Sequence, residues 1–200
     1  MVHGQHICVL EVDGEEIGVM MGWEKDIMRE TVQKLCLDHP KASELKVLNI
    51  GFGLGIVSPF FQEKKLVRVN YDQKIDSLFQ NLPSCPTQHV IIEAHPDVLR
   101  HMRETGWYDK IGVKILEGKW QDFLDSDDWL SSGGFDVIYT DTFSEDYNDL
   151  WQFFEHLPDL MADADSRFSF FNGLGATSGF MPKIPRCIDY THLVHRSNFL

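Results

Sequence analysis

Three glycines at alternate positions form the stretch of this chain whose residue types most clearly point to chemistry. Gly51, Gly53 and Gly55 directly follow the apolar run from Val47 to Ile50. Glycine lets the main chain turn tightly and lets a ligand lie against the backbone, and a helix opening after the loop attracts negative charge at its N-terminus. The dinucleotide fingerprint G-x-G-x-x-G places its third glycine where Ile56 stands here. The loop therefore predicts a nucleotide-like cofactor and favours S-adenosylmethionine over NAD, the alternative being a simple tight connection.

Two carboxylates stand at the ends of further apolar runs. Glu93 closes the run that begins at His89, and Asp141 follows the run from Phe135 to Thr140. Because ligands of open α/β sheets bind beyond the carboxyl ends of the strands, we expect Glu93 to accept the hydroxyl protons of a ribose. Asp141 is expected beside the reactive end of the cofactor. A helix-capping acid and a solvated loop carboxylate are the respective alternatives.

A third apolar run, Val113 to Leu116, leads into Gly118, Lys119 and Trp120. An aromatic and a polar side chain in this position can bracket and hydrogen-bond an adenine ring. An ordinary place in the hydrophobic core is an equal alternative for Trp120.

Composition and charge exclude several function classes. The 200 residues are 43% hydrophobic and carry a formal net charge of -13, which argues against a nucleic-acid partner and suits a cationic substrate. No apolar run is long enough to span a bilayer, so we expect no membrane partner. The four cysteines and the histidines lack the spacing of metal ligands, which predicts no metal site and a reducing compartment.

Five apolar runs alternate with amphipathic segments, and this alternation predicts a parallel sheet covered by helices. The runs are Lys46 to Ile50, His89 to Glu93, Val113 to Leu116, Phe135 to Tyr139 and Phe168 to Phe171. The predicted helices are near Trp23 to Leu37, Pro96 to Thr105 and Leu150 to Met161. Before them, residues 7–21 are strand-like and are interrupted by the turn dipeptide Asp13-Gly14.

The chain divides into three parts by pattern. Residues 1–17 form an N-terminal segment of uncertain structure, residues 18–178 form one domain, and residues 179–200 form a tail that Pro182 and Pro185 interrupt. Residues 66–85 make the first crossover about twice the usual length, which indicates an insertion.

A set of motifs, taken in order, resembles one family. The motifs are Val19 to Glu24, Leu48 to Ile56, Ile92 to Val98, Gly118 to Trp120, Tyr139 to Phe143 and Phe170 to Gly175. From about Gly18 to Ser178 the chain resembles the fungal protein arginine N-methyltransferases of the δ-nitrogen (type IV) class, which are related to guanidinoacetate N-methyltransferase. The resemblance implies a Rossmann-like α/β fold with a seven-stranded sheet, S-adenosyl-L-methionine as methyl donor and a protein substrate carrying arginine. We expect a monomer in the cytoplasm and nucleus.

The resemblance also implies roles for individual residues. Those that would line the cofactor site are Met20, Gly51, Phe52, Gly53, Leu54, Gly55, Ile56, Glu93, Ala94, His95, Gly118, Lys119 and Asp141. A guanidinium is protonated in water and is a poor nucleophile, so the site must hold it in line with the methyl group and accept its hydrogen bonds as a proton leaves. Asp141 is the first candidate for that role. Glu24, or else Glu15 or Glu16, is the second carboxylate, and Asn172 would orient the substrate.

Three departures from the family limit what the resemblance implies. The 66–85 insertion has no counterpart, nothing before Gly18 resembles the ankyrin-like repeats of family members, and the similarity fades after Ser178. We therefore expect the sheet to lack its last strands and the run Phe168 to Phe171 to form its edge. The alternatives are a methyltransferase acting on a small guanidino compound such as guanidinoacetate, a catalytically inactive truncated fragment, and an NAD-dependent oxidoreductase, which the glycine spacing disfavours.

Overall fold

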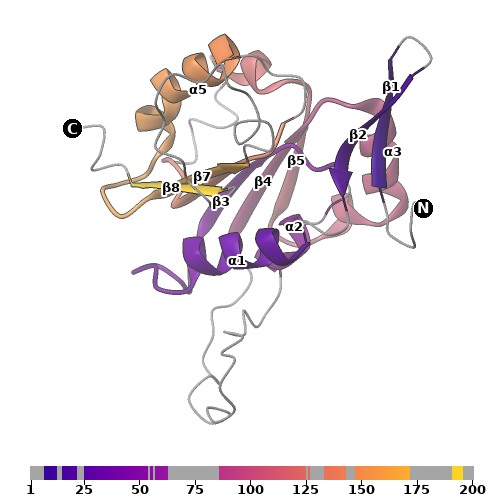
Figure 1. Ribbon diagram of the computed structural model, residues 1–200. Helices are drawn as coiled ribbons and strands as arrows, with labels where there is room; N and C mark the ends of the chain where they lie inside the picture. Colours follow the sequence, from indigo (N-terminus) through magenta and orange to yellow (C-terminus); the bar gives the residue numbers. More distant parts are fainter. Residues whose placement is uncertain are drawn as a thin grey trace.

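The computed structural model of the protein describes residues 7–12, 15–21, 25–53, 55, 57–62, 86–124, 126, 133–142, 147–171 and 191–195. Strands and helices alternate along the chain, as the apolar runs predict (Figure 1). In order they are β1 (Ile7–Val12), β2 (Glu15–Met21), α1 (Lys25–Cys36), β3 (Lys46–Ile50), α2 (Val57–Gln62), β4 (Gln88–Glu93), α3 (Pro96–Glu104), the 3-10 turn η2 (Trp107–Asp109), β5 (Val113–Glu117), the 3-10 turn η3 (Trp120–Phe123), β6 (Val137–Thr140), α5 (Tyr147–Leu160), β7 (Arg167–Phe171) and β8 (Thr191–His195).

The five predicted strands form the parallel part of one sheet. The strand order is β5-β4-β3-β6-β7-β8, and β3 pairs in parallel with both β4 and β6. In this register Leu48 lies between Val90 and Ile138. Parallel strands need helical crossovers that bury both faces of the sheet, which explains why these segments read as unbroken apolar runs. β1 and β2 pair antiparallel with each other in a separate two-stranded sheet.

The expectation that the sheet ends at β7 is wrong. β8 pairs antiparallel with β7, so that Arg167 lies opposite His195 and Phe171 opposite Thr191. Proline lacks an amide proton and cannot donate to a sheet, but the five residues of β8 follow the prolines of the tail and include none. Within the described residues the sheet therefore has six strands, and β8 is the outermost strand on that side. The predicted insertion at 66–85 lies outside the described residues, and the domain boundaries stay predictions.

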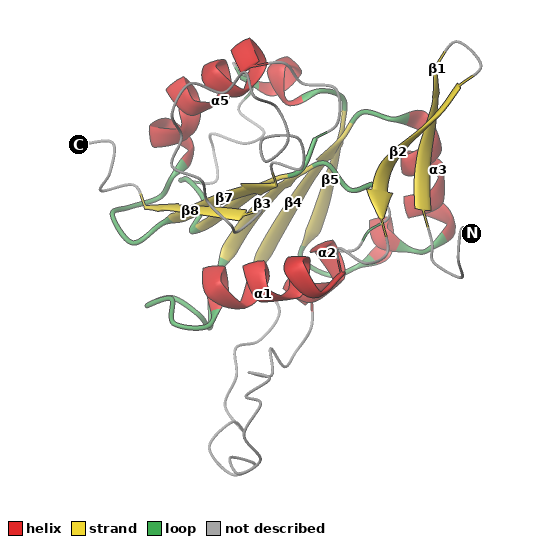
Figure 2. Cartoon of the chain, viewed as in Figure 1, coloured by secondary structure: helices red, strands yellow, loops and turns green. Residues whose placement is uncertain are grey.

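Helices cover both faces of the sheet, with α1 and α2 on one side and α5 on the other (Figure 2). On the α1 side the buried cluster consists of Met28, Val32, Leu35, Cys36, Leu45, Val47, Phe61, Val137 and Tyr139. A neighbouring cluster joins Ile91 of β4 to Leu99 and Met102 of α3. Successive side chains of a strand point to opposite faces, so these residues alternate with those that face α5.

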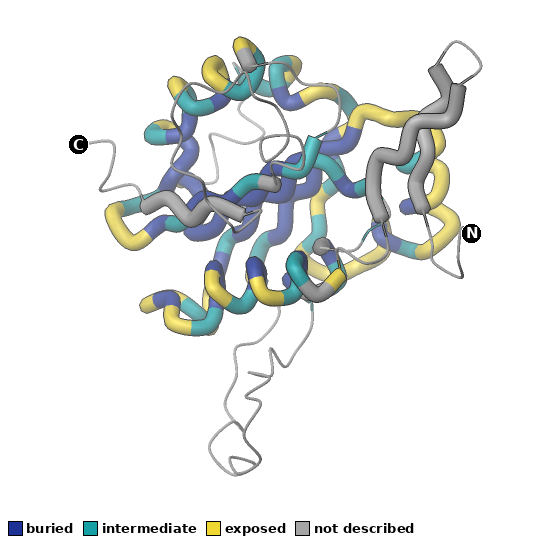
Figure 3. The backbone as a smooth tube through the Cα atoms, in the orientation of Figure 1, coloured by how far each residue is buried: buried dark blue, intermediate teal, exposed yellow. Residues whose placement is uncertain are grey.

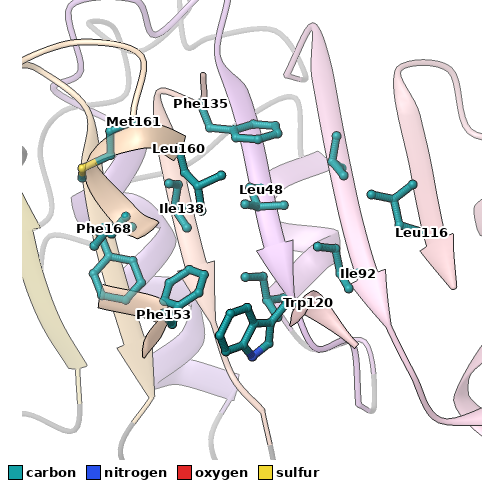
Figure 4. Close-up of a cluster of buried hydrophobic side chains, with 13 residues drawn as sticks. Leu48, Ile92, Leu116, Trp120, Phe135, Ile138, Phe153, Leu160, Met161 and Phe168 are labelled. Carbon is teal, nitrogen blue, oxygen red and sulfur yellow. The ribbon is translucent and has the colours of Figure 1, made fainter. Parts of the chain in front are cut away.

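The face covered by α5 carries the largest cluster, in which Leu48, Ile92 and Ile138 meet the aromatic rings of Phe153 and Phe168 (Figure 4). The central strands are buried along their length, whereas the outer surfaces of the helices are exposed (Figure 3). Each buried aliphatic or aromatic side chain stabilises the fold by about 1.5–3 kcal/mol. This core fixes the strand ends, where the predicted site residues lie. No helix in the described part of the chain is long and apolar enough to cross a membrane.

Candidate functional site

The structure brings part of the predicted set, namely the glycine loop, Glu93, Gly118 and Asp141, together at the carboxyl ends of four neighbouring strands. The first residue past each of three strands donates its backbone amide to the adjacent strand: Gly118 to the Glu93 carbonyl, Gly51 to the Ile92 carbonyl and Asp141 to the Ile50 carbonyl, each at 2.9 Å. The sheet ladder therefore continues one step beyond β5, β3 and β6. The glycine loop, Glu93 and Asp141 consequently occupy one edge of the sheet.

Gly51 is required by the close approach of β6. Its φ angle is 85°, and a Cβ atom at this position would lie 2.1 Å from the carbonyl oxygen of Asp141. Gly55 also has a positive φ, 69°, and a Cβ there would meet the ring of Phe52 at 2.6 Å. Only glycine fits both positions without displacing its neighbour. The loop thus turns tightly, with Gly51 packed against the Asp141 carbonyl and Gly55 against the Phe52 ring.

Phe52 anchors the glycine loop to the rest of the molecule. Its ring is buried and packs edge-on against Trp107, with centroids 5.0 Å apart, beside Leu99 and Met102. Its backbone amide donates to Oε2 of Glu93 at 2.8 Å. The side chain of Phe52 thus belongs to the core, and its main chain belongs to the candidate site.

Glu93 is 8% exposed, and both of its carboxylate oxygens are engaged by backbone amides. Oε2 accepts from Phe52, and Oε1 accepts from the amide of His95 at 2.7 Å. An ionised carboxylate has about four acceptor positions, so about two remain for further donors. Glu93 therefore tethers the chain just before α3 and lies against the glycine loop, while its predicted contact with a ribose stays a prediction.

Ala94 and His95 are exposed and lead into α3. His95 is the N-cap of that helix: its Nδ1 accepts from the amide of Asp97 at 3.3 Å, and Pro96 occupies the first turn. The imidazole of His95 therefore serves the start of α3, and its predicted cofactor contact stays a prediction.

Trp120 follows β5 but packs inside the molecule. Its side chain is 2% exposed and meets Phe153 edge-on, with centroids 5.3 Å apart (Figure 4). This is the core interpretation of the residue, and a contact between its ring and an adenine stays a prediction. Gly118 and Lys119 precede it in a short turn that Asp122 closes by accepting the Lys119 amide at 2.9 Å.

The backbone of Asp141 is fixed against the two neighbouring segments of the site. The residue is half-buried, its amide donates to the Ile50 carbonyl of β3, and its own carbonyl oxygen faces Gly51. Met20 lies in β2, opposite Cys8. The remaining predicted site residues, Glu24, Leu54, Ile56 and Asn172, lie outside the described residues. The roles predicted for all of these residues stay predictions. Among the described residues, no group of three or more His, Cys, Asp or Glu is arranged to hold a metal ion.

The sequence-based reasoning missed one buried polar residue of the site, Asn49. Its side chain is fully buried in β3 and donates from Nδ2 to the carbonyl of Gly51 at 2.7 Å. The signal was present in the sequence, because Asn49 is the one polar residue within the run Val47 to Ile50. A polar side chain inside a strand that is buried on both faces needs an internal hydrogen-bond partner.

Known proteins of similar sequence give the next information about the chain. The chain matches no protein-family model. It is similar to fungal proteins named protein arginine N-methyltransferase 2. It is 41% identical over 201 residues to that of Cryptococcus neoformans, which covers 92% of this chain and 50% of the relative. It is 46% identical over 161 residues to that of Yarrowia lipolytica (80% of this chain and 29% of the relative) and 43% identical over 182 residues to that of Candida glabrata (90% and 37%). The chain thus spans half or less of the length of these relatives.

Solved structures with low sequence identity share the architecture. A hypothetical protein from Thermus thermophilus matches with a TM-score of 0.54 at 15% identity, over 85% of this chain and 84% of that one. The O-methyltransferase TomG from Streptomyces achromogenes, solved in complex with SAM, matches with a TM-score of 0.50 at 16% identity, over 82% and 63%. At such identities the similarity concerns the fold alone. The chain has the Rossmann-like α/β fold of the S-adenosylmethionine-dependent methyltransferases.

Proposed function

We propose that this chain is an S-adenosylmethionine-dependent methyltransferase that transfers a methyl group to the δ nitrogen of arginine in a protein substrate. The observation that carries the proposal is the meeting of the glycine loop, the Glu93 carboxylate and Asp141 at one edge of the sheet. Similarity to the fungal proteins named protein arginine N-methyltransferase 2 supports the arginine class. The δ-nitrogen specificity rests on the motif resemblance.

The residues present fit the proposed cofactor. Gly51 and Gly55 allow a tight loop packed against the Asp141 carbonyl and the Phe52 ring, and neither residue places a side chain between the loop and a ligand. Glu93 keeps about two acceptor positions, the number that the two hydroxyls of a ribose require. We therefore assign the loop to the methionine and ribose portions, and Glu93 to the ribose. The cofactor supplies an electrophilic methyl group on a sulfonium.

Asp141 is the residue we assign to the substrate. A guanidinium carries a positive charge at any physiological pH and presents a planar fork of N–H donors. A carboxylate beside Gly51 would accept two of those donors, fix the plane of the group and stabilise the charge while the δ nitrogen loses its proton. Glu24 and Asn172 are proposed as further substrate contacts on the basis of the resemblance.

The first experiment is a calorimetric titration of the purified chain with S-adenosylhomocysteine. The wild-type chain should bind saturably. Because Glu93 also holds the amides of Phe52 and His95, replacement by alanine would disturb the loop itself, so Glu93→Gln is the better probe. It preserves the size of the side chain and one carbonyl oxygen, and it should weaken binding by about tenfold, the effect of one charge-assisted hydrogen bond. Lack of binding by the wild-type chain, or binding of NADH instead, would refute the proposal.

The second experiment addresses the methyl acceptor. Radiolabelled S-adenosylmethionine would be supplied with an arginine-containing peptide or with guanidinoacetate, and the labelled arginine would be analysed for the methylated nitrogen. We expect label on the δ nitrogen of the peptide and its loss in Asp141→Asn. Transfer to guanidinoacetate alone would favour the small-molecule alternative. Cofactor binding without transfer to either would favour a catalytically inactive fragment.

A location in the cytoplasm and nucleus, and a monomeric state, are proposed from the resemblance alone.

A further inference from the structure

A buried polar side chain contacts the glycine loop, and the proposed function gives it no role. Asn49 is fully buried in β3, between the apolar residues Leu48 and Ile50. Its Nδ2 donates both to the Gly51 carbonyl, at 2.7 Å, and to Oγ of Ser58, at 3.2 Å. Ser58 is itself fully buried in the first turn of α2. One side-chain amide therefore connects the strand, the loop and the helix that follows.

The same peptide group is held from both of its ends. The carbonyl of the Gly51–Phe52 peptide accepts from Asn49, and the amide of that peptide donates to Oε2 of Glu93 at 2.8 Å. The orientation of this one peptide plane thus depends on both side chains. Conversely, the plane fixes where the Glu93 carboxylate lies, because its Oε2 is bound to it. Asn49 and Glu93 act on each other through the backbone of the loop.

The flexibility of Gly51 explains why its peptide group needs these hydrogen bonds. Gly51 must lack a Cβ because of the Asp141 carbonyl, but glycine moves freely between backbone conformations. A hydrogen bond to its carbonyl restores the restriction that the missing side chain would have supplied. Asn49 is therefore placed to remove the flexibility that Gly51 introduces.

Stability alone does not explain an asparagine here. Asn49 Oδ1 is buried and has no hydrogen-bond partner among the described residues, which is unfavourable in a folded protein. Asparagine is also a poor strand former compared with valine or isoleucine. A side chain of that kind in the middle of the core is more simply explained by what its Nδ2 does for the loop.

We propose that Asn49 is a positioning residue for cofactor binding, which orients the Gly51–Phe52 peptide and, through it, the Glu93 carboxylate. The inference rests on the proposed function, since the ligand in question is the S-adenosyl group. It predicts that cofactor affinity and fold stability respond differently when the asparagine and its serine partner are replaced together.

The test is the double variant Asn49→Val, Ser58→Ala, titrated with S-adenosylhomocysteine. The double variant leaves no unpaired serine, but the Gly51 carbonyl loses its donor, so the melting temperature should fall by about as much as in the control variant Val47→Ala. The Kd should rise about tenfold, as expected for a lost positioning hydrogen bond. Asn49→Leu, which keeps the branched shape without any polar atom, should weaken binding in the same way and provides the measurement if the double variant does not fold.

Val47→Ala is the matched control, because Val47 is fully buried two residues earlier in the same strand and on the same face. It should lower the melting temperature and leave the Kd within about twofold. If the double variant and Asn49→Leu bind like the wild type, or if Val47→Ala weakens binding as strongly as they do, the role of Asn49 is refuted while the proposed function stands. If the wild-type chain does not bind S-adenosylhomocysteine, the proposed function fails and the role of Asn49 fails with it.

Discussion

The two ends of the sheet are held by different kinds of contact. At the amino ends, the buried carboxylate of Asp136 accepts from the Lys46 amide and pairs with the Lys41 ammonium, each at 2.9 Å. Nearby, the Arg167 guanidinium donates to the last carbonyls of α1. Backbone hydrogen bonds join the strands at both ends, but at the carboxyl ends the buried carboxylate, Glu93, binds two amides rather than a cation.

This difference predicts which end of the sheet tolerates substitution without loss of ligand binding. Charged side chains at the amino ends contribute free energy without dictating the path of the main chain, so their replacement should alter stability and leave ligand binding intact. At the carboxyl ends the main chain itself forms the proposed binding surface. Substitutions there should therefore alter affinity more than their effect on stability suggests.

The largest effect is expected for Gly51→Ala. The new Cβ would lie 2.1 Å from the Asp141 carbonyl oxygen, so β3 and β6 would have to separate at the site. We expect the Kd for S-adenosylhomocysteine, measured by calorimetry, to rise at least about 100-fold, together with a loss of stability of a few kcal/mol.

Gly106→Ala is the control that separates the effect of the Cβ collision at Gly51 from the effect of backbone strain at a positive φ. Gly106 has a similar φ, 73°, but no atom of the described residues would lie within 4 Å of a Cβ added there. This variant should lose about 1 kcal/mol of stability and no affinity. Native affinity in Gly51→Ala would show that the close approach of the two strands does not shape the site, and the comparison of the two ends would fail.

The next largest effect is expected at the opposite end, for Asp136→Asn. The substitution keeps the volume of a side chain that is 3% exposed and removes its charge from the Lys41 ammonium and the Lys46 amide. We expect the free energy of unfolding, measured in urea, to fall by about 2–3 kcal/mol, as for other buried hydrogen bonds to a charged group. The Kd for S-adenosylhomocysteine should change by less than about twofold. A change in affinity as large as that of a site residue would mean that the two ends are coupled.

The sequence predicted the parallel strands well because burial on both faces leaves a continuous apolar signal. It also predicted that Glu93 and Asp141 lie at strand ends, whereas their roles stay predictions. It did not predict β8. Five residues after two prolines carry little local pattern, and their pairing with β7 depends on contacts distant in the sequence. For Trp120 the sequence left a core position and an adenine contact equally open, because tryptophan occurs both in hydrophobic cores and against the rings of ligands. The polar residue Asn49 stands out within its apolar run, but the sequence does not show which groups its side chain binds.

A third effect depends on pH and comes from His89, at the amino end of β4. The imidazole is fully buried beside Phe61 and Trp107, and its Nδ1 lies 3.0 Å from Nε2 of Gln62. Burial lowers the pKa of His89 to about 3. The unfolded chain, with a histidine pKa of about 6.5, takes up a proton that the folded chain excludes as the pH falls below that value.

The stability that His89 contributes is therefore present in full above about pH 6.5 and is lost progressively between about pH 6.5 and 3. From about pH 7 to about pH 5 we expect a loss of about 2 kcal/mol in the free energy of unfolding. In His89→Leu the same interval should show a correspondingly flatter profile, which urea unfolding at the two pH values would measure. Identical slopes for the two proteins would exclude this histidine as the source.

The smallest effect is expected for Glu117→Gln, which tests whether position at the carboxyl edge is sufficient. Glu117 precedes Gly118, but its side chain is exposed and binds Tyr108 and Arg103. The Tyr108 hydroxyl and then the Arg103 guanidinium lower the pKa of the Glu117 carboxyl, so its contribution is present above its unfolded pKa and is lost as the pH falls through the folded value. Solvent screens such contacts, and we expect a melting temperature lower by only about 1–2 °C and an unchanged Kd. A strong loss of affinity would mean that charge at the edge, rather than the backbone geometry set by Gly51, Glu93 and Asn49, governs binding.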